Sequence, residues 1–283
     1  MRLARVGTVG RERAAVYDSE GRLRYLPEAL GDVDAAFWGD GRRDEVVRLV
    51  AAGELGEVVD EYVRRGAPIA KPEKVICIGL NYRDHALETG SPIPEEPIIF
   101  MKAPNCVVGP YDEVLIPRGS TKTDWEVELG VVIGVRSRYL VDPAAAAKVI
   151  AGYCVSHDVS EREYQLERGG QWDKGKSCET FNPLGPWLVT PDEVPDPQAL
   201  GLKLSVNGVV RQDGTTADMI FGVAYVVWYL SQFMVLEPGD LINTGTPKGV
   251  SLGHDDVPYL RAGDVVELSI DRLGAQRSVM GQA

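Results

Sequence analysis

The sequence has little of what marks several common classes of protein. Only four of its 283 residues are cysteine, namely Cys77, Cys106, Cys154 and Cys178, and no two of them form a CxxC pair. A zinc site and a disulfide framework are therefore not expected. No run of about 18 apolar residues occurs, so the sequence predicts no membrane-spanning helix.

An excess of positive charge is also missing. The net charge is −12 at pH 7, which argues against binding to nucleic acids or anionic membranes, because both need a basic face. The GxGxxG and P-loop patterns are absent, so a nucleotide-binding parallel sheet is not supported. No long apolar stretch follows Met1–Arg5, and we therefore expect no signal peptide and a cytosolic location.

The composition is that of an ordinary globular protein, with 44% hydrophobic and 25% charged residues. The length allows one large domain or one domain with a small appendage. Residues 1–70 contain short strand-like pieces, one or two helices and no cluster of catalytic residue types, and they read as an accessory domain. The pieces are Leu3–Val9, Ala14–Tyr17, Leu23–Tyr25 and the helical stretch Asp44–Arg65, followed by the Pro/Gly-rich linker Arg65–Pro72.

Residues 71–283 are rich in short apolar or alternating runs, which predict an α+β, mostly β catalytic domain. Asn207-Gly208 between two such runs is a hairpin signal. The expected strands are Val75–Leu80, Ile98–Lys102, Glu126–Val135, Ala151–Val159, Leu202–Val206, Val209–Gln212, Leu241–Thr244 and Val265–Ile270. The expected helices are Pro143–Ile150 behind an Asp142 N-cap, Ser160–Arg168 with a Ser160/Glu163 capping box, and Asp218–Phe233.

The stretch Asp124-Trp125-Glu126-Val127-Glu128-Leu129 carries the strongest chemical signal. It places two carboxylates two residues apart at the start of the apolar run Leu129–Val135. In a strand, Glu126 and Glu128 share one face, where like charges are unfavourable without a cation between them. Mg²⁺, Mn²⁺ and Ca²⁺ prefer such oxygen ligands, and Asp158 could supply a third. A solvated edge strand is the equally weighted alternative.

The three histidines differ in their surroundings. On a short helix His85 and Glu88 would be three residues apart and within hydrogen-bonding reach, an arrangement suited to water activation. A surface His–Glu pair is the more common origin of this pattern. His157 reads as a structural residue, and His254 lies in a polar loop and reads as solvated.

Two polar segments could reach into a site. The loop Gln171–Ser177 carries Lys176, which could neutralise a substrate carboxylate or an enolate, although a solvated lysine is the simpler reading. Thr244-Gly245-Thr246-Pro247-Lys248-Gly249 follows a predicted strand, and its glycines permit tight turns that expose backbone N–H groups to an anion.

In their order along the chain, these pieces resemble the fumarylacetoacetate hydrolase family, which is also known for acylpyruvases and 2-hydroxyhepta-2,4-diene-1,7-dioate isomerases. The resemblance covers roughly residues 72–272. The matching stretches are Gly79–His85, Ile99–Lys102, Asp124–Leu129, His157–Ser160, Gln171-Trp172 with Gly175–Ser177, and Asn243–Gly249. The family resemblance implies a β-roll or half-barrel catalytic domain, a small N-terminal α/β domain and a homodimer.

The resemblance also implies roles for individual residues. One Mg²⁺ or Mn²⁺ per subunit would be held by Glu126, Glu128 and Asp158. His85 and Glu88 would form a water-activating dyad, with Lys176 against the substrate. The resemblance further implies substrate contacts from four residues: Thr246, Gln165, Gln171 and Lys102.

The reaction expected from the resemblance is metal-dependent hydrolysis of the C3–C4 bond of a 2,4-dioxo acid to pyruvate and a carboxylic acid. Acylpyruvates, fumarylpyruvate and 2,4-diketo-3-deoxy sugar acids are the candidate substrates, with a slight preference for the last. An oxaloacetate decarboxylase, a tautomerase or a 2-hydroxy-dienoate isomerase on the same site is the alternative. A non-catalytic protein with a structural cation is a third reading, which the joint presence of His85, Glu88 and Lys176 disfavours.

Overall fold

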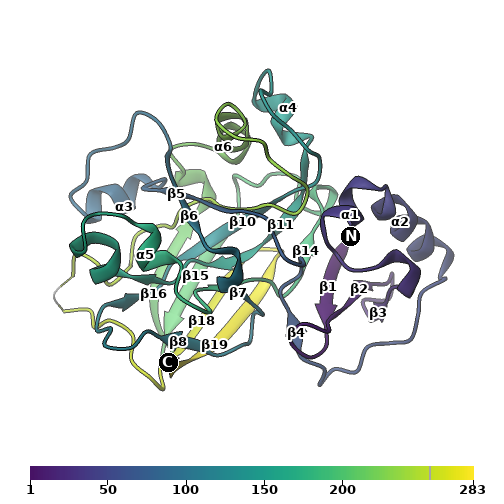
Figure 1. Ribbon diagram of the computed structural model, residues 1–283, viewed down its shortest axis with the longest axis horizontal. Coiled ribbons are helices and arrows are strands. Elements are labelled where there is room, and N and C mark those ends of the chain that lie inside the picture. Colours follow the sequence, from purple (N-terminus) through teal and green to yellow (C-terminus); the bar gives the residue numbers. More distant parts are fainter. Residues whose placement is uncertain (255) are drawn as a thin grey trace.

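The computed structural model describes residues 1–254 and 256–283. It is a mixed α and β structure made mostly of strands, with two large sheets that pack against each other and short helices at their edges (Figure 1). The expected α+β, mostly β class is confirmed. The sheets do not close into a barrel.

The larger sheet runs from the N-terminal strands to the strands around the Asp124–Leu129 motif. Neighbouring strands along it are β3 (Leu23–Tyr25), β2 (Arg13–Tyr17), β1 (Arg2–Val6), β14 (Leu188–Val189), β11 (Ile150–His157), β10 (Val127–Ile133), β17 (Leu241–Asn243), β5 (Val75–Gly79) and β6 (Ile98–Lys102), while β4 (Arg65–Gly66) also pairs with β1.

The second sheet is built from the C-terminal third of the chain and one earlier strand. Its order is β16 (Val209–Thr215), β15 (Gly201–Val206), β18 (Val265–Ile270), β19 (Gly274–Gln282) and β8 (Val114–Ile116). The predicted hairpin at Asn207-Gly208 joins β15 to β16, and both residues have positive φ, as that turn requires. Two short pairs complete the strands: β9 (Thr123–Asp124) with β12 (Ser160–Glu161), and β7 (Val107–Val108) with β13 (Asn182–Pro183).

The helices are short. They are α1 (Ala35–Gly39), α2 (Arg42–Ala52), α3 (Arg83–Glu88), α4 (Pro143–Ala147), α5 (Asp173–Lys176) and α6 (Val223–Leu230), together with a π-helical turn at Glu163–Glu167 and 3₁₀ turns at Glu28–Leu30, Pro104–Cys106, Pro191–Glu193 and Thr216–Asp218. None of the helices described is long and apolar enough to cross a membrane.

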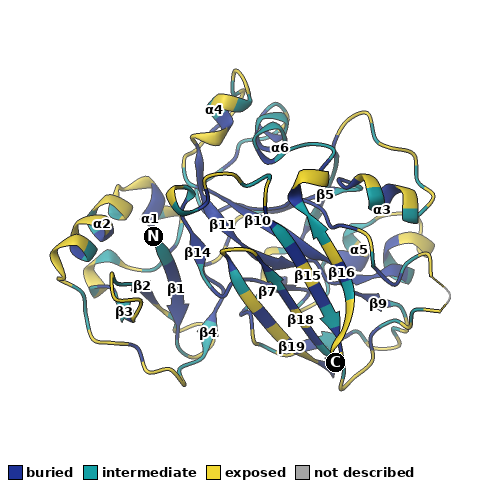
Figure 2. Cartoon of the chain, turned by 180° about the vertical axis from the view of Figure 1, so that it is seen from behind, coloured by how far each residue is buried: buried dark blue, intermediate teal, exposed yellow. Residues whose placement is uncertain are grey.

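The centre of the larger sheet is its most buried part. Every residue of β10 and β11 is buried, whereas β18 alternates between buried and more exposed positions (Figure 2). A strand with one face toward water shows such alternation, and a strand covered on both faces reads as a continuous apolar run. The run that begins at Leu129 is therefore apolar because both of its faces are covered. The alternative of a solvated edge strand is wrong.

Two predicted helices are wrong in extent or kind. Helix α2 ends at Ala52, because Gly53 adopts a left-handed conformation with φ of 70° and terminates it, and the valines from 58 to 63 lie in irregular chain. Ser160 does not cap a helix. It begins β12, and its hydroxyl donates to the carbonyl of Asp158, leaving only the π-helical turn within the predicted Ser160–Arg168 helix.

Two other predicted helices are shorter than expected. Asp142 does cap α4, with its Oδ1 accepting a hydrogen bond from Ala145 N at 2.7 Å, but Ile150 already belongs to β11. The predicted Asp218–Phe233 helix is reduced to α6, since Gly222 is extended and precedes its first turn. Among the predicted strands, β1 ends at Val6 and β10 at Ile133, two or three residues early.

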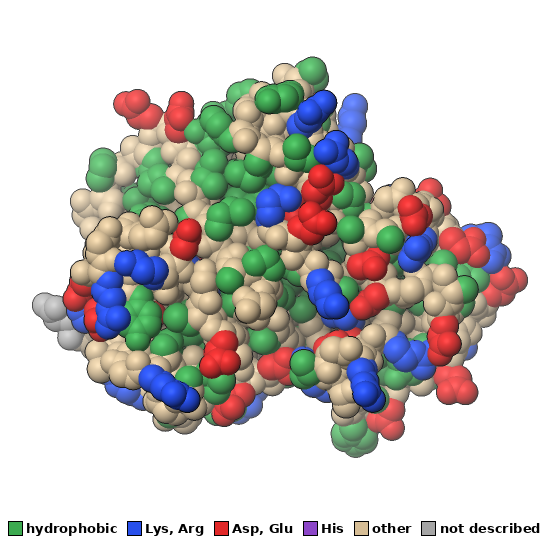
Figure 3. All heavy atoms as spheres, viewed as in Figure 1, with side chains coloured by type: hydrophobic (Ala, Val, Ile, Leu, Met, Phe, Trp, Pro, Cys, Tyr) green, Lys and Arg blue, Asp and Glu red, His purple; other side chains and the backbone are tan. Residues whose placement is uncertain are grey.

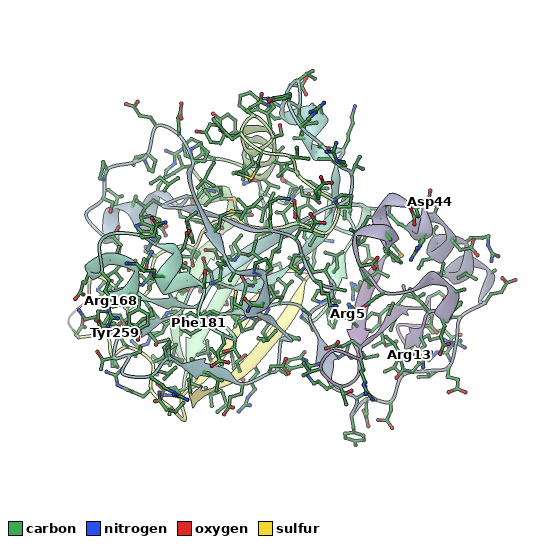
Figure 4. All side chains as sticks on the ribbon, viewed as in Figure 1. Arg5, Arg13, Asp44, Arg168, Phe181 and Tyr259 are labelled. Atoms are coloured by element: carbon green, nitrogen blue, oxygen red, sulfur yellow. The ribbon has the colours of Figure 1, made fainter. Side chains whose placement is uncertain are left out.

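The N-terminal region joins the larger sheet directly. Strand β1 pairs antiparallel with β14, with Arg2 opposite Val189 and Leu3 opposite Leu188. Arg5, labelled in Figure 4, lies at this junction. Its guanidinium pairs with Asp32 at 2.6 Å and donates to the carbonyl of Ala67. A domain boundary near residue 70 stays a prediction, and the sheet itself continues across it.

The surface carries charges of both signs. On the face seen in Figure 3, acidic and basic side chains are interspersed, and hydrophobic side chains gather over the region of α6. Along α6 and its flanks the rings of Phe221, Tyr225, Tyr229 and Phe233 follow one another at centroid separations of 4.8 to 6.2 Å.

Candidate active site

A cavity of about 280 Å³ opens beside the ends of β5 and β10. Glu126 and Glu128 of the Asp124–Leu129 motif, His85 of α3 and several apolar side chains line it. The cavity therefore brings together segments that are up to 175 residues apart in sequence, from Ile78 to Gly253.

Three carboxylates form what we call the acidic floor: Glu126, Glu128 and Asp158. Each offers an oxygen within 4.8 Å of the others, and all three are buried. Glu126 and Glu128 share a face because they are two residues apart in extended chain. Asp158 is brought beside them by the pairing of β10 with β11, which continues as a hydrogen bond from Asp158 N to the carbonyl of Glu126 at 3.0 Å.

Buried cations surround the acidic floor. Lys176, the last residue of α5, places its Nζ 2.8 Å from Glu126 Oε2 and 3.0 Å from Asp158 Oδ2. Arg162 lies 2.7 Å from Glu126 Oε1 and donates from Nε to Asp124 at 2.8 Å. Lys102 forms an ion pair with the other carboxylate oxygen of Asp158, Oδ1. The floor together with Asp124 thus has four carboxylates against three cations.

The three cations do not neutralise the carboxylates of the floor equally. Burial opposes the charge of Glu126, but Lys176 and Arg162 lower its pKa below the ordinary value. Burial and the neighbouring Asp158 and Glu126 raise the pKa of Glu128 well above the ordinary value. The ionised form of Glu128 therefore needs a further positive charge, and a divalent cation among three carboxylate oxygens is what Mg²⁺ and Mn²⁺ sites provide. The residues present fit such an ion.

His85, Glu88 and His254 form what we call the rim of the cavity. His85 is buried, and its Nδ1 lies 3.4 Å from Glu88 Oε2. The other oxygen of Glu88 lies 2.7 Å from His254 Nε2, and the backbone N–H of Gly249 donates to both oxygens. Burial opposes the Glu88 charge, yet these hydrogen bonds lower its pKa below the ordinary value. His85 and Glu88 are thus not a solvated surface pair.

His254 is an exposed loop residue, as expected, but it also has a specific partner that the sequence did not indicate. Its side chain is 38% exposed, and it pairs with Glu88 across 166 residues of sequence. His157, in contrast, is wholly buried in β11, and burial together with Lys102 lowers its pKa to about 3. The imidazole of His157 is therefore neutral at pH 7.

Asp124 connects the floor to the rim. Its carboxylate accepts hydrogen bonds from the backbone N–H groups of Ser251 and Leu252, at 2.8 and 3.0 Å, as well as the ion pair with Arg162. With the bonds from Gly249 and His254 to Glu88, these contacts hold the segment 249–254 over the cavity.

The four residues expected to contact substrate lie in different places. Thr246 and Gln165 line the cavity. The Thr246 hydroxyl donates to the carbonyl of Val127 at 2.9 Å. Arg162 donates to Gln165 Oε1, so the Gln165 amide is held by its oxygen. Lys102 lies behind the floor on Asp158, and Gln171 is exposed and pairs with Asp173. Neither Lys102 nor Gln171 belongs to the cavity lining.

Three residues of the site were missed in the sequence: Asp124, Arg162 and His254. Asp124 begins the motif and gave a usable signal, since an acid before a buried strand needs a partner. Arg162 was hidden within a predicted helix. His254 gave none, because its partner lies 166 residues away.

Comparison with known proteins agrees with this arrangement. Residues 74–280 match the family model described as Fumarylacetoacetate (FAA) hydrolase C-terminal. Because the match covers more than half of the sequence, the chain belongs to the fumarylacetoacetate hydrolase family. It is 50% identical, over 98% of its length and 97% of the relative's, to a protein of Burkholderia multivorans that is provisionally named a hydrolase.

Solved structures of the family include both hydrolases and isomerases. A fumarylacetoacetate hydrolase of Exiguobacterium antarcticum is 33% identical with a TM-score of 0.83, and all of both chains is covered. A 5-carboxymethyl-2-hydroxymuconate delta-isomerase of Mycobacterium smegmatis is 32% identical with a TM-score of 0.78, covering 100% of this chain and 99% of the other. The family thus carries more than one reaction on one fold.

Proposed function

We propose that this protein is a metal-dependent hydrolase that cleaves the C3–C4 bond of a 2,4-dioxo acid, giving pyruvate and a carboxylic acid. The observation that carries the proposal is one cavity that joins a buried three-carboxylate floor to a histidine held by a carboxylate. The two parts have the composition needed to bind an oxo acid and to activate water.

We propose that Glu126, Glu128 and Asp158 hold one Mg²⁺ or Mn²⁺. When bound, the ion would supply Lewis-acid polarisation of the 1-carboxylate and the 2-oxo group. The excess of one carboxylate over the three cations, when Asp124 is counted with the floor, and the raised pKa of Glu128 support this assignment.

The residues of the rim supply the proton transfers. Glu88 orients the His85 imidazole, which accepts a proton from water as the hydroxide adds to the 4-carbonyl carbon. The C3–C4 bond then breaks, and its electron pair passes to C3 as the pyruvate enolate. The Lys176 ammonium lies at the floor, where it neutralises this enolate, and C3 takes up a proton to give pyruvate.

The ion pairs of Lys176 keep it charged for this role. Burial opposes the charge of its ammonium, but Asp158 and Glu126 raise its pKa above the ordinary value. The Gln165 amide is then a neutral donor available to the oxo and carboxylate oxygens. The Thr246 hydroxyl already donates to Val127 and accepts from Gln212, so a substrate contact from it requires that one of these bonds be exchanged. Lys102 and Gln171 act at most through other residues, since Lys102 contacts Asp158 and Gln171 contacts Asp173.

Pyruvate release tests the proposal. Acetylpyruvate, fumarylpyruvate and a 2,4-diketo-3-deoxy sugar acid are incubated with the protein and Mg²⁺ or Mn²⁺, and again with EDTA. Stoichiometric pyruvate and carboxylic acid that disappear with EDTA are the expected result. Failure to cleave any dioxo acid with either metal would reject the hydrolase.

Decarboxylation, tautomerisation or isomerisation on the same site is the second candidate, and the likeness to an isomerase favours keeping it. Such a reaction uses the floor and Lys176 but no attacking water, so oxaloacetate turnover is measured in parallel.

A homodimer also stays a proposal. The exposed ring of Phe233 beside α6 offers an apolar surface for it, and sedimentation of the protein tests it. A cytosolic location stays a prediction.

A further inference from the structure

Much of the cavity lining outside the acidic floor is apolar. Five side chains from five separate segments form it, and we call them the apolar wall: Leu80, Phe100, Leu166, Trp172 and Leu252. Leu80 follows β5, Phe100 lies within β6, and Leu166 lies in the π-helical turn. Trp172 precedes α5, and Leu252 lies in the segment 249–254. An apolar surface drawn from so many segments is a built feature of the site.

The ring of Trp172 is fitted into this wall. It meets Phe100 edge-on, with ring centroids 5.4 Å apart. A Cβ at Gly79 would lie 2.5 Å from Cζ3 of Trp172, closer than real contacts allow. Only glycine at position 79 therefore leaves room for the indole against the end of β5, and the indole in turn faces the cavity.

The charged groups that reach the cavity are concentrated at the floor. Arg162 pairs with Asp124 and Glu126, and Lys176 pairs with Glu126 and Asp158. Among the described lining residues, no arginine or lysine is left over for a second carboxylate at the far end of a substrate. Burying such a carboxylate against leucine and tryptophan without a partner is strongly unfavourable.

Two neutral polar side chains of the lining are engaged with the chain itself. Thr89 and Ser91 line the cavity, and the Thr89 hydroxyl contacts the carbonyl of His85 at 3.0 Å and the Ser91 hydroxyl at 3.1 Å. A row of sugar hydroxyls would therefore meet carbon on most of this side. The wall suits a tail that gains by leaving water.

We propose that the site selects 2-oxo acids whose distal part is an uncharged, apolar acyl group, aliphatic or aromatic, over those ending in a second carboxylate or a polyol. This inference deepens the proposed function and rests on it for the orientation of the substrate. The oxo-acid head lies at the floor and the tail lies on the apolar wall. It excludes fumarylpyruvate and the sugar acids as preferred substrates.

A matched pair of ligands tests the selection without turnover. 2-Oxohexanoate and 2-oxoadipate have the same number of carbons and the same head, and differ only in a terminal methyl or carboxylate. Titration calorimetry with the Mn²⁺-loaded protein gives both dissociation constants. We expect 2-oxohexanoate to bind at least tenfold more tightly. Equal or tighter binding of 2-oxoadipate, or binding of neither acid, would overturn the proposal.

A single charge in the wall locates the tail. Leu166 is 41% exposed, so Leu166→Lys is tolerable for folding and adds a cation beside the cavity. We expect it to raise the affinity for 2-oxoadipate about tenfold and to narrow or reverse the preference. Val141→Lys, at an 84% exposed position outside the cavity, is the matched control and should leave the ratio of the two dissociation constants unchanged. If Leu166→Lys gave the same ratio of dissociation constants as this control, the placement of the tail would be overturned.

Turnover separates this inference from the proposed function. Pyruvate release from hexanoylpyruvate is compared with release from fumarylpyruvate. If both compounds are cleaved and fumarylpyruvate is preferred, the proposed preference for an apolar acyl group is wrong, while the proposed hydrolase activity is supported. Tighter binding of 2-oxohexanoate without cleavage of any dioxo acid would reject the hydrolase and leave the apolar wall standing.

Discussion

The acidic floor and the rim of the cavity are built in contrasting ways. The floor lies at the adjoining ends of β10 and β11, two strands buried along their whole length, and its carboxylates are fixed by the strand period and by one cross-strand pairing. The rim depends on the six-residue helix α3 and an irregular segment, joined through the carboxylate of Glu88. One part is positioned by the core and the other by hydrogen bonds between loops.

This difference suggests a division of labour. The floor offers a rigid arrangement of charge, which suits binding an ion and an oxo acid. The rim depends on a few contacts that each contribute little, which suits a segment that opens for substrate and closes for reaction. Variants in the two parts should therefore fail differently: floor variants in binding, and rim variants in the rate of water attack.

The largest effect is expected from the floor. In Glu128→Gln the side-chain size is kept and one ligand oxygen is lost, so Mn²⁺ affinity should fall more than the roughly 10–100-fold typical of residues that only support a ligand. Calorimetric titration of Mn²⁺ and pyruvate release measure it. Glu267→Gln, at an exposed acid of the second sheet, is the control. Unchanged Mn²⁺ affinity in Glu128→Gln would remove the floor as the metal site.

His85→Asn should separate chemistry from binding. Loss of a general base typically lowers the rate by about 10²–10⁴-fold, while Mn²⁺ affinity at the floor should stay within a factor of two or three. Cleavage of acylpyruvates and turnover of oxaloacetate are measured on the same preparation. If acylpyruvate cleavage survives, water activation by His85 is wrong. If no dioxo acid is cleaved even by the wild type and oxaloacetate turnover survives in His85→Asn, the decarboxylase or tautomerase becomes the better assignment.

Glu88→Gln should change the pH dependence of stability. The pKa of Glu88 is lowered in the folded protein, so its hydrogen bonds stabilise the fold above the carboxyl pKa of the unfolded chain, about 4.3, and that contribution disappears as pH falls through the lower folded-state pKa. The wild type should therefore melt above Glu88→Gln at pH 7, and the two melting temperatures should converge below about pH 4. A constant difference at all pH values would contradict this.

The smallest effect is expected at His254. In the proposed mechanism it acts through Glu88, so His254→Ala should lower kcat about threefold to tenfold, the equivalent of one net hydrogen bond, with little change in Mn²⁺ affinity. His254→Gln, which keeps a donor, should recover part of the rate. Loss of Mn²⁺ affinity, or no recovery by glutamine, would indicate general unfolding of the segment instead.

The contrast between floor and rim also explains what the sequence predicted. Glu126 and Glu128 are two residues apart, so a strand alone puts them on one face. Asp158 required only that β11 pair with β10, and its place just after an apolar run supported that pairing. The strands with continuous apolar runs could also be predicted from local sequence, because a strand buried on both faces is apolar at nearly every position.

Only part of the rim is visible in the sequence, namely the helical spacing of His85 and Glu88. The contact between Glu88 and His254 spans 166 residues, and His254 lies outside any helix or strand. Ser160 to Arg168 carries a good helix-start signal, but pairing of Ser160–Glu161 with β9 and the ion pairs of Arg162 outweigh it. Local propensity is a weak term next to a buried ion pair and a strand ladder, and the competing partners are not visible locally.

The pairing of β1 with β14 has a consequence for dividing this molecule. The family match begins at residue 74, yet strand β1, near the start of the chain, covers an edge of the sheet that contains β11 and β10. A fragment cut at residue 70 would present β14 with unpaired N–H and C=O groups, a template for joining other chains edge to edge. By pairing with β14, the N-terminal strands therefore keep this edge of the sheet from pairing with other chains.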